Sequence, residues 1–245
     1  MTRSVLLCLC LGIHLIAAGQ LAVPKFEVGL NAGVFVYQGD LTPSQLGSYK
    51  TLKPGLNVFL NRIISPVFSL RTNLAIGGLK GDDAKYPTPA YRQQRNFNFH
   101  SPAVEVSELL VADVFKNNMS RSSAGLSPYL FAGLGFSLLN IKRDWTRFNA
   151  EYFSSEQSTI SGLTADQQHP LPALIPAIPV GIGIRYPISS SISVNAETSY
   201  RFTFTDYLDG FSKAANEARR DSYLTHTVGL VYQFRNNSWM KCPTF

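Results

Sequence analysis

Apolar and polar residues alternate over long stretches of the chain, most clearly in residues 191–204. From Ile192 to Phe204, every second side chain is apolar, aromatic or Thr, and the residues between them, such as Glu197 and Arg201, are polar. Successive side chains of a strand point to opposite faces, so a period of two predicts a β-strand. At about thirteen residues, this strand is longer than the usual five or six of a globular sheet and has the length of a tilted membrane crossing.

The same alternation recurs and predicts eight long strands. They are Phe26–Gly39, Leu52–Asn61, residues 67–79, Ser101–Phe115, Pro128–Asn140, Ala177–Tyr186, residues 191–204 and Tyr223–Phe234. The connections alternate in length: 62–66, 116–127 and 187–190 are the shorter ones, and 40–51, 80–100, 141–176 and 205–222 the longer ones. Short turns on one rim and long loops on the other are typical of an up-and-down outer-membrane barrel with both termini in the periplasm.

Alternation alone leaves open which face is outside, because a soluble lipocalin-type barrel has the same period with its apolar face inward. Lysines lie only at strand ends, in loops or in the tail, whereas a strand face in water would carry some of them. The polar faces carry Gly, Ser and Asn, which suit a narrow interior, and aromatic residues gather near both predicted rims. We therefore predict an all-β fold, an eight-stranded antiparallel transmembrane barrel of the outer membrane whose apolar face contacts lipid.

Charged residues fall on the predicted inner face. They are Glu27, Arg71, Glu105, Arg185, Glu197 and Arg201, with Asp113 nearer the periplasmic rim. A buried charge is costly unless it is paired, so we expect an ion-pair network that fills the lumen. The alternative, an ion-conducting path, is less favoured because wide channels belong to larger barrels.

Glu108 does not fit the fourth strand. With Val106 and Leu110 outward, Glu108 would face lipid, which is destabilising at mid-depth. A β-bulge near Ser107, or a shift of register, would turn it inward. The alternative is that Glu108 contacts another protein within the membrane.

The two ends of the chain differ from the strands. Met1–Gly19 has the basic, apolar and small-residue regions of an export signal, which leaves residues 20–234 for the barrel and 235–245 for a periplasmic tail. Cys8 and Cys10 fall in the signal, so Cys242 is the one cysteine expected in the mature chain. The net charge of +6 is spread along the chain without a basic cluster, and the export signal leads away from the cytoplasm, which argues against nucleic acid as a partner.

Candidate chemistry is sparse. His100, His169 and His226 are the histidines outside the signal, and His226 has Ser222 and Asp221 close in sequence. A serine nucleophile needs a histidine base within hydrogen-bond reach, and closeness in sequence does not establish that geometry. The chain has no metal-ligand spacing and no phosphate-binding glycine motif. We therefore expect no enzyme activity and no cofactor. The long loop 141–176 is expected to be external, and 205–222 to form a short helix over the mouth.

Several motifs resemble a family of small outer-membrane barrels from Bacteroidetes, the PorG-like family. They are Tyr37-Gln38-Gly39-Asp40-Leu41, Thr205-Asp206-Tyr207-Leu208-Asp209, Asp221-Ser222-Tyr223 and Cys242-Pro243. The resemblance implies an outer-membrane component of the type IX secretion machinery that associates with a periplasmic ring of PorK-like lipoprotein and PorN-like protein. By position, the tail would make such a contact, and Trp239, Met240 and Cys242 make it apolar for a solvated end.

Three functions remain open at this point. The first is a non-enzymatic barrel that sits among outer-membrane lipids and anchors a secretion complex. The second is a stand-alone structural or adhesive barrel that binds through its long loops. The third is a lipid-modifying barrel enzyme that uses His226 or His100.

Overall fold

The computed structural model describes residues 25–44, 46–115, 125–215 and 220–234. The predicted signal, residues 1–19, and the predicted tail with Trp239, Met240 and Cys242 therefore lie outside the described residues. The strands are β1 Lys25–Gln38, β2 Lys53–Ile63, β3 Phe68–Asp82, β4 Asn98–Asp113, β5 Ser127–Leu139, β6 Lys142–Asp144, β7 Leu174–Pro187, β8 Ile192–Thr203 and β9 Ser222–Gln233. The helices are η1 Tyr49–Thr51, η2 Asp83–Lys85, α2 Tyr91–Arg95 and α3 Gln157–Gln168.

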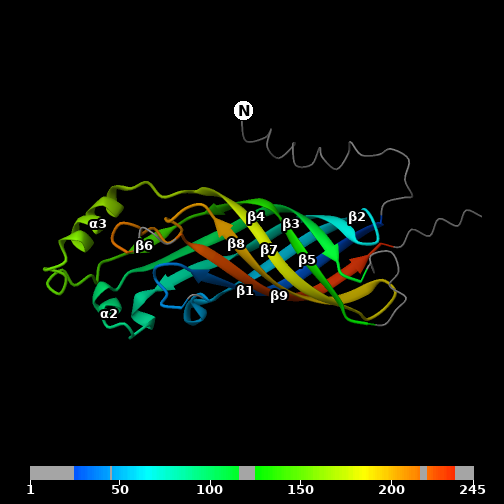
Figure 1. Ribbon diagram of the computed structural model, residues 1–245, viewed down its shortest axis with the longest axis horizontal. Helices are drawn as coiled ribbons and strands as arrows, with labels where there is room; N and C mark the ends of the chain where they lie inside the picture. Colours follow the sequence, from blue (N-terminus) through cyan, green and yellow to red (C-terminus); the bar gives the residue numbers. More distant parts are fainter. Residues whose placement is uncertain (1–24, 45, 116–124, 216–219, 235–245) are drawn as a thin grey trace, which may run out of the picture.

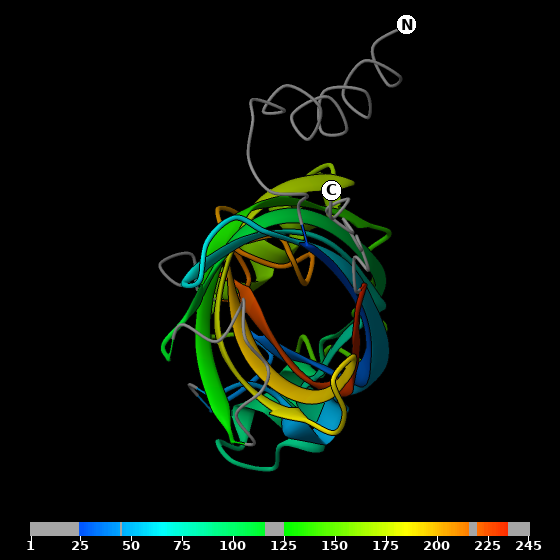
Figure 2. The ribbon, with the colours of Figure 1, turned by 90° about the vertical axis from the view of Figure 1, so that its right-hand side faces the viewer.

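Eight of the described strands close into a barrel, and β6 stands apart from that ring. The order is β3-β2-β1-β9-β8-β7-β5-β4, and a further pairing between β3 and β4 joins the two edges. Every pairing is antiparallel. Figure 2 looks along the axis and shows the strands as a closed ring. The predicted eight-stranded antiparallel barrel is confirmed, and closure pairs the backbone groups that an open sheet would leave at its edges.

The two ends of the barrel differ, as Figure 1 shows. At the short-turn end lie the connections β2–β3, β4–β5 and β7–β8, together with the start of β1 and the end of β9. At the loop end lie the long connections β1–β2, β3–β4, β5–β7 and β8–β9, which carry the helices and β6. The alternation of short turns and long loops is thus as the sequence predicts.

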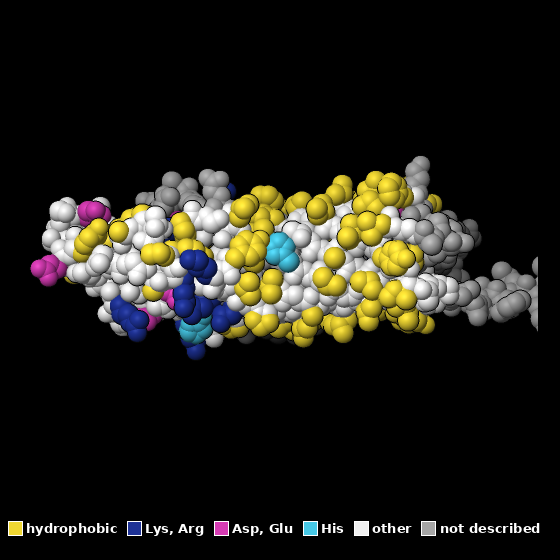
Figure 3. Space-filling view, turned by 90° about the horizontal axis from the view of Figure 1, so that it is seen from below, with side chains coloured by type: hydrophobic (Ala, Val, Ile, Leu, Met, Phe, Trp, Pro, Cys, Tyr) yellow, Lys and Arg dark blue, Asp and Glu magenta, His cyan; other side chains and the backbone are white. Residues whose placement is uncertain are grey.

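The alternation sorts side chains between the wall and the lumen. In β8, Ser193, Asn195, Glu197, Ser199, Arg201 and Thr203 are buried, and the residues between them face out. On the outside, many large apolar side chains are exposed over all eight barrel strands, and Figure 3 shows them as a broad band on one face of the barrel. We call this band the apolar belt. No helix within the described residues is long and apolar enough to cross a membrane.

Two strands are longer than the sequence predicts. β3 continues to Asp82 and β4 begins at Asn98, so this hairpin rises past the rest of the wall at the loop end, where β6 pairs with it. The outward positions there are polar, for example Lys80 and His100, so the apolar alternation that marks the belt is lost. The strands continue because their inward residues, such as Phe99, still pack in a core.

Glycines on the inner face make room for large neighbours. A Cβ at Gly183 of β7 would lie 2.3 Å from the ring of Tyr129 on β5. Tyr129 can therefore lie across the neighbouring strand, where its hydroxyl reaches Glu197. Small residues on one strand thus set the position of a polar group in the lumen.

The structure contradicts the bulge predicted near Ser107. β4 pairs with β3 and β5 without interruption through this point, with Thr72 opposite Glu108 on one side and Leu134 on the other. Glu108 therefore stays on the outward face, where the Thr72 hydroxyl donates a 2.9 Å hydrogen bond to its carboxylate. A bulge would have broken ladder hydrogen bonds with both neighbouring strands.

The long loops fold together over the loop end of the barrel, and we call this assembly the cap. Its core includes Leu41, Phe97, Leu163, Leu208 and Phe211, all buried, and it is continuous with inward residues of the barrel wall. The segment predicted as an external loop, 141–176, contains β6 and α3. Residues 205–215 form turns and bends where a helix was expected, and residues 216–219 lie outside the described residues.

Candidate functional site

The structure brings the six predicted inner charges together as three ion pairs. Arg185 lies 3.2 Å from Glu27, Arg71 lies 2.6 Å from Glu197, and Arg201 lies 3.1 Å from Glu105. All six side chains are buried, and Arg71 is fully shielded from solvent. Because the partners come from β1, β3, β4, β7 and β8, the pairs span the lumen rather than lie along one wall.

Polar neighbours extend these pairs, and one of them joins two of the pairs. Asn61 of β2 donates to Glu27 at 3.0 Å and accepts from Arg71 at 2.8 Å, which joins the first pair to the second. Tyr129 of β5 donates to Glu197 at 2.6 Å, and Tyr223 of β9 donates to Glu105 at 2.6 Å. Each barrel strand contributes at least one group, so the network ties opposite walls together and fills the interior that eight strands enclose.

Asp113 lies apart from this network. It is buried at the short-turn end of β4, and its carboxylate accepts the backbone N–H of Phe115 at 3.0 Å. It therefore shapes the turn that follows β4.

At the loop end, three of the motifs that carry the family resemblance meet at one hydroxyl. Tyr37, from the first motif, lies 2.6 Å from Asp209 and 3.0 Å from Asp221, from the second and third motifs. All three side chains are fully buried. Asp221 also accepts the backbone N–H groups of Leu208 and Asp209, so it holds the β8–β9 loop against β1.

The hydrogen bonds among Tyr37, Asp209 and Asp221 require a second proton besides that of the Tyr37 hydroxyl. The Tyr37 hydroxyl has one hydrogen, which points to one carboxylate only. If Tyr37 donates to Asp209, the oxygen of Asp221 beside it needs a proton of its own in order to donate to Tyr37. Burial raises the pKa of Asp209 and of Asp221 well above the usual range, and the nearby carboxyl of Asp40 raises both further. One proton therefore belongs to this buried site.

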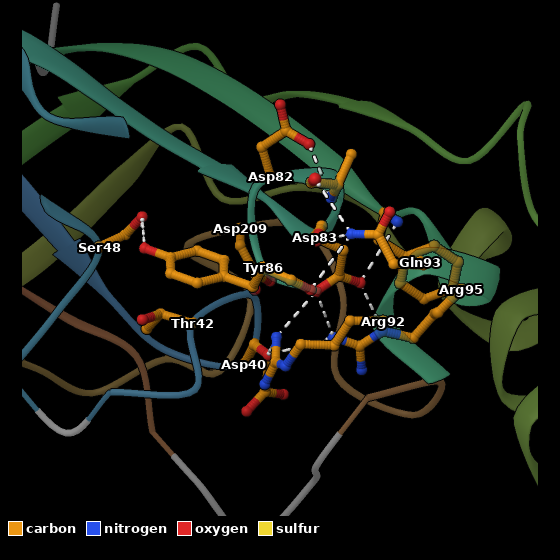
Figure 4. A network of polar contacts seen from close by, with 12 residues as sticks. Asp40, Thr42, Ser48, Asp82, Asp83, Tyr86, Arg92, Gln93, Arg95 and Asp209 are labelled. Atoms are coloured by element: carbon orange, nitrogen blue, oxygen red, sulfur yellow. Dashed lines mark hydrogen bonds and ion pairs between the residues drawn. The ribbon is translucent and has the colours of Figure 1, made fainter. Parts of the chain in front are cut away.

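A second buried group fixes the β3–β4 connection, as Figure 4 shows. Asp83 accepts from Arg92 at 2.8 Å and from Arg95 at 2.7 Å and 3.0 Å, and both arginines also donate to the backbone carbonyl of Asp40. The two cations share one buried carboxylate, and the arginines join the β3–β4 loop to the loop after β1.

Asp166 plays a similar part for α3. It accepts three backbone N–H groups, from Ser212, Lys213 and Ala214, and the Tyr207 hydroxyl at 3.1 Å. A carboxylate with this many donors anchors the helix to the β8–β9 loop. The cap is therefore held by buried carboxylates that each join two loops.

The histidines do not assemble a nucleophilic site. His226 faces outward, with Nε2 2.9 Å from the Tyr49 hydroxyl and Nδ1 3.1 Å from the Thr198 hydroxyl. Ser222 lies four residues away along β9, about 13 Å at the rise of a strand, and Asp221 is engaged in the cap. His169 stacks on Tyr207. Within the part of the chain that the structure describes, no cluster of His, Cys, Asp or Glu could hold a metal ion.

The buried groups of the cap could not be predicted from single residues. Asp83, Arg92, Arg95 and Asp166 lie in loops with no periodic pattern, so their partners were not visible in the sequence. Tyr37, Asp209 and Asp221 were within motifs singled out for resemblance alone, and nothing in the spacing of these motifs indicates that they converge.

Three solved structures illustrate what the chain resembles. The attachment invasion locus protein Ail of Yersinia pestis, in complex with the heparin analogue sucrose octasulfate, has a TM-score of 0.45 at 10% identity, over 87% of this chain and 100% of Ail. Neisserial surface protein A has a TM-score of 0.44 at 13% identity, over 85% and 97%. The outer-membrane protein OprG of Pseudomonas aeruginosa has a TM-score of 0.43 at 8% identity, over 87% and 97%.

No curated protein sequence matches the chain. One protein family does, over residues 3–240, which is nearly the whole length. The chain belongs to the family described as Domain of unknown function (DUF6089).

Proposed function

We propose that the protein is a closed, non-enzymatic outer-membrane barrel that anchors a periplasmic protein assembly. The observation that carries this proposal is the combination of an apolar belt outside and a lumen filled by three buried ion pairs inside. An outer surface of this kind suits lipid, and a lumen filled in this way suits a rigid anchor better than a channel.

The short-turn end supports a contact on the periplasmic side. The described parts of its three turns expose large apolar side chains: Ile64, Phe115, Leu126 and Ile188 are each more than half exposed. Exposed apolar residues at the tips of turns are a common feature of surfaces that bind another protein. In this proposal, that end faces the periplasm, as in barrels whose short turns lie on the periplasmic side.

We further propose that the assembly is the periplasmic ring of the type IX secretion machinery. Support comes from the resemblance to the PorG-like family, whose motifs include the three that meet at Tyr37. The predicted tail 235–245 is the second element of the proposed contact, with Trp239, Met240 and Cys242 as its apolar residues.

The test is co-purification of the tagged barrel from native membranes in mild detergent, followed by mass spectrometry. Ile64→Ser with Ile188→Ser removes apolar side chains at the short-turn end, and Leu46→Ser with Tyr152→Ser is the matched change in the cap. Truncation after Phe234 tests the tail. Loss of ring proteins in the first pair and the truncation, with retention in the cap pair, supports the proposal. A barrel that purifies alone from native membranes contradicts it.

One observation favours a second candidate, a barrel that binds an external ligand through its loops. The cap has its own core and buried carboxylates, so it presents a fixed surface. Surface binding lost on removal of residues 146–168 in a barrel that still folds would favour this candidate.

A further inference from the structure

Cationic side chains lie in a row on the outward face, where the apolar belt meets the cap. Lys80 of β3 pairs directly with His100 of β4, and His100 pairs with Lys142 of β6. Figure 3 shows Lys and Arg side chains gathered at this boundary, with a histidine among them. The pairing register thus places three basic side chains side by side at one height.

Lys53, at the start of β2, lies beside the row, although the register pairs it with the inward-facing Phe35 of β1. Gly78 lies two residues before Lys80 on the same outward face, and a Cβ at Gly78 would lie 3.3 Å from the Cβ of Lys53. The missing side chain at Gly78 gives the stem of Lys53 its place beside the hairpin. We call Lys53, Lys80, His100 and Lys142 the cationic row.

The cationic row occupies a defined level between two others. Toward the belt, the next two outward pairs, Gly78 with Pro102 and Ile76 with Val104, carry no polar side chain. Toward the cap, the next outward positions are Asp82, Asn98 and Asp144, which pair with one another across the three strands. Along the outer surface from the belt toward the cap, apolar side chains are therefore followed by cationic and then by acidic side chains.

The charges of the row are only partly balanced within the protein. Lys80 lies 3.8 Å from Asp82. Among the residues that the structure describes, neither Lys53 nor Lys142 forms a salt bridge. Basic groups placed opposite one another across strands repel, so an anion between them would stabilise this part of the hairpin.

We propose that the cationic row binds the phosphorylated headgroup of a membrane lipid whose acyl chains lie on the belt below. This inference rests on the proposed placement of the barrel in a membrane. Lysine ammonium groups bind phosphate as point charges, and cationic side chains beside a membrane attract anionic lipids. A single molecule with apolar chains and a phosphate head satisfies both adjacent levels at once.

Continuity with the belt distinguishes this ligand from a soluble anion. The belt residues under the row, Ile76, Val104 and Leu138, lie on adjoining strands and face outward together. A free phosphate would use the row alone, whereas a phosphorylated lipid uses both surfaces, and its affinity depends on both.

The test measures lipid binding to the full barrel, purified in neutral detergent, by native mass spectrometry. The probes are lipid A with both phosphates, the same lipid A without phosphates, and inorganic phosphate as competitor. The variant is Lys80→Gln with Lys142→Gln. The control, Arg147→Gln with Lys213→Gln, removes the same charge from exposed positions of the cap. A shift in gel mobility on heating verifies that each variant is folded.

We expect the phosphorylated lipid to bind the Lys80→Gln, Lys142→Gln variant about twenty-five-fold more weakly than the unmodified barrel, because each lysine contributes roughly fivefold. The control is expected to retain full affinity, and lipid A without phosphates to bind all three proteins weakly and alike. Equal affinity of variant and unmodified barrel for the phosphorylated lipid would overturn the inference, as would displacement of the lipid by equimolar inorganic phosphate. The lipid-binding assay uses purified protein, so a negative result there does not contradict the proposed periplasmic anchor. A negative co-purification, in turn, does not contradict lipid binding by the cationic row.

Discussion

The hydroxyl of Tyr37 lies 2.6 Å from a carboxylate oxygen of Asp209, although 172 residues separate them in the chain. Tyr37 ends an inward row of β1, and Asp209 lies in the loop between β8 and β9. Asp221 completes the site from the other side of the same hydroxyl. This contact joins the barrel wall to the cap, so the state of one buried proton affects how firmly the cap is held.

The first prediction concerns pH. The folded cap raises the pKa of Asp221, so the folded form keeps a proton that the unfolded chain loses near pH 4. Cap stability is therefore full below about pH 4 and falls as the pH rises toward the raised value, by about 1.4 kcal/mol per unit. Asp221→Asn replaces the protonated carboxyl by an amide donor and should flatten this decline.

The cap has a built-in reporter for this measurement. Trp145 packs edge-on against Phe211, with ring centroids 6.4 Å apart, and Trp239→Phe removes the other tryptophan. Urea titrations of Trp145 fluorescence at several pH values give the stability of the cap. Asp144→Asn, at an exposed carboxyl whose pKa is lowered by the N–H of Thr146, serves as control and should leave the decline intact. An unchanged slope in Asp221→Asn would refute the shared proton.

The second prediction concerns the centre of the lumen. Glu197→Gln leaves the fully buried Arg71 without its carboxylate, which should destabilise the barrel by about 3–5 kcal/mol. Arg71→Met in the same chain removes the unpaired cation and should restore part of that loss. Urea unfolding in detergent, followed by the mobility shift on gels, measures both. Glu151→Gln, in an exposed part of the cap, is the control. A loss below 1 kcal/mol in Glu197→Gln would mean that the pair does not hold the walls together.

The third prediction concerns the cap arginines. Asp83→Asn removes the carboxylate that Arg92 and Arg95 share, and leaves two buried cations unpaired. The loop between β3 and β4 should open, so trypsin should cut after Arg92 or Arg95 within a barrel that stays folded. Asp82→Asn removes a neighbouring charge that lies 3.8 Å from Lys80 and does not touch either arginine, and its amide oxygen can still accept the N–H of Ala84, so this variant should keep the unmodified cleavage pattern. Equal resistance of the two variants would argue against the role of Asp83.

The fourth prediction concerns conduction. The three ion pairs and the tyrosines between them fill the lumen, so the unmodified barrel in a planar bilayer should show no steady ion current. Arg71→Ala with Glu197→Ala removes the central pair and should give brief openings. Stable, uniform conductance steps from the unmodified protein would show that the lumen is a pore.

The alternation predicted the eight strands of the barrel wall correctly. Each strand has one face toward the lumen and one toward the apolar belt, so polar and apolar residues alternate along it with a period of two. The alternation also predicted which charged side chains face the lumen, because every second residue of a strand lies on the same face. These residues are Glu27, Arg71, Glu105, Arg185, Glu197 and Arg201. The partner of each charge depends on how strands on opposite walls are aligned along the barrel axis. The period of two does not specify this alignment.

The contacts of the cap could not be predicted from the alternation, for a physical reason. Its contacts, such as Asp166 with Ser212, join distant loops and follow no period. The prediction near Ser107 was wrong for a different reason, because unbroken pairing on both sides of β4 outweighed the unfavourable position of Glu108. At that site, the Thr72 hydroxyl donates to the carboxylate on the outer face.

In our proposal, the short-turn end faces a periplasmic partner. Photo-crosslinking in living cells tests this contact, with a photoreactive residue at Ile188 in the β7–β8 turn or at Leu46 in the cap, both highly exposed. We predict crosslinks from Ile188 to proteins of a periplasmic ring and none of these from Leu46. Crosslinks to those proteins from Leu46 alone would refute a periplasmic contact at the short-turn end.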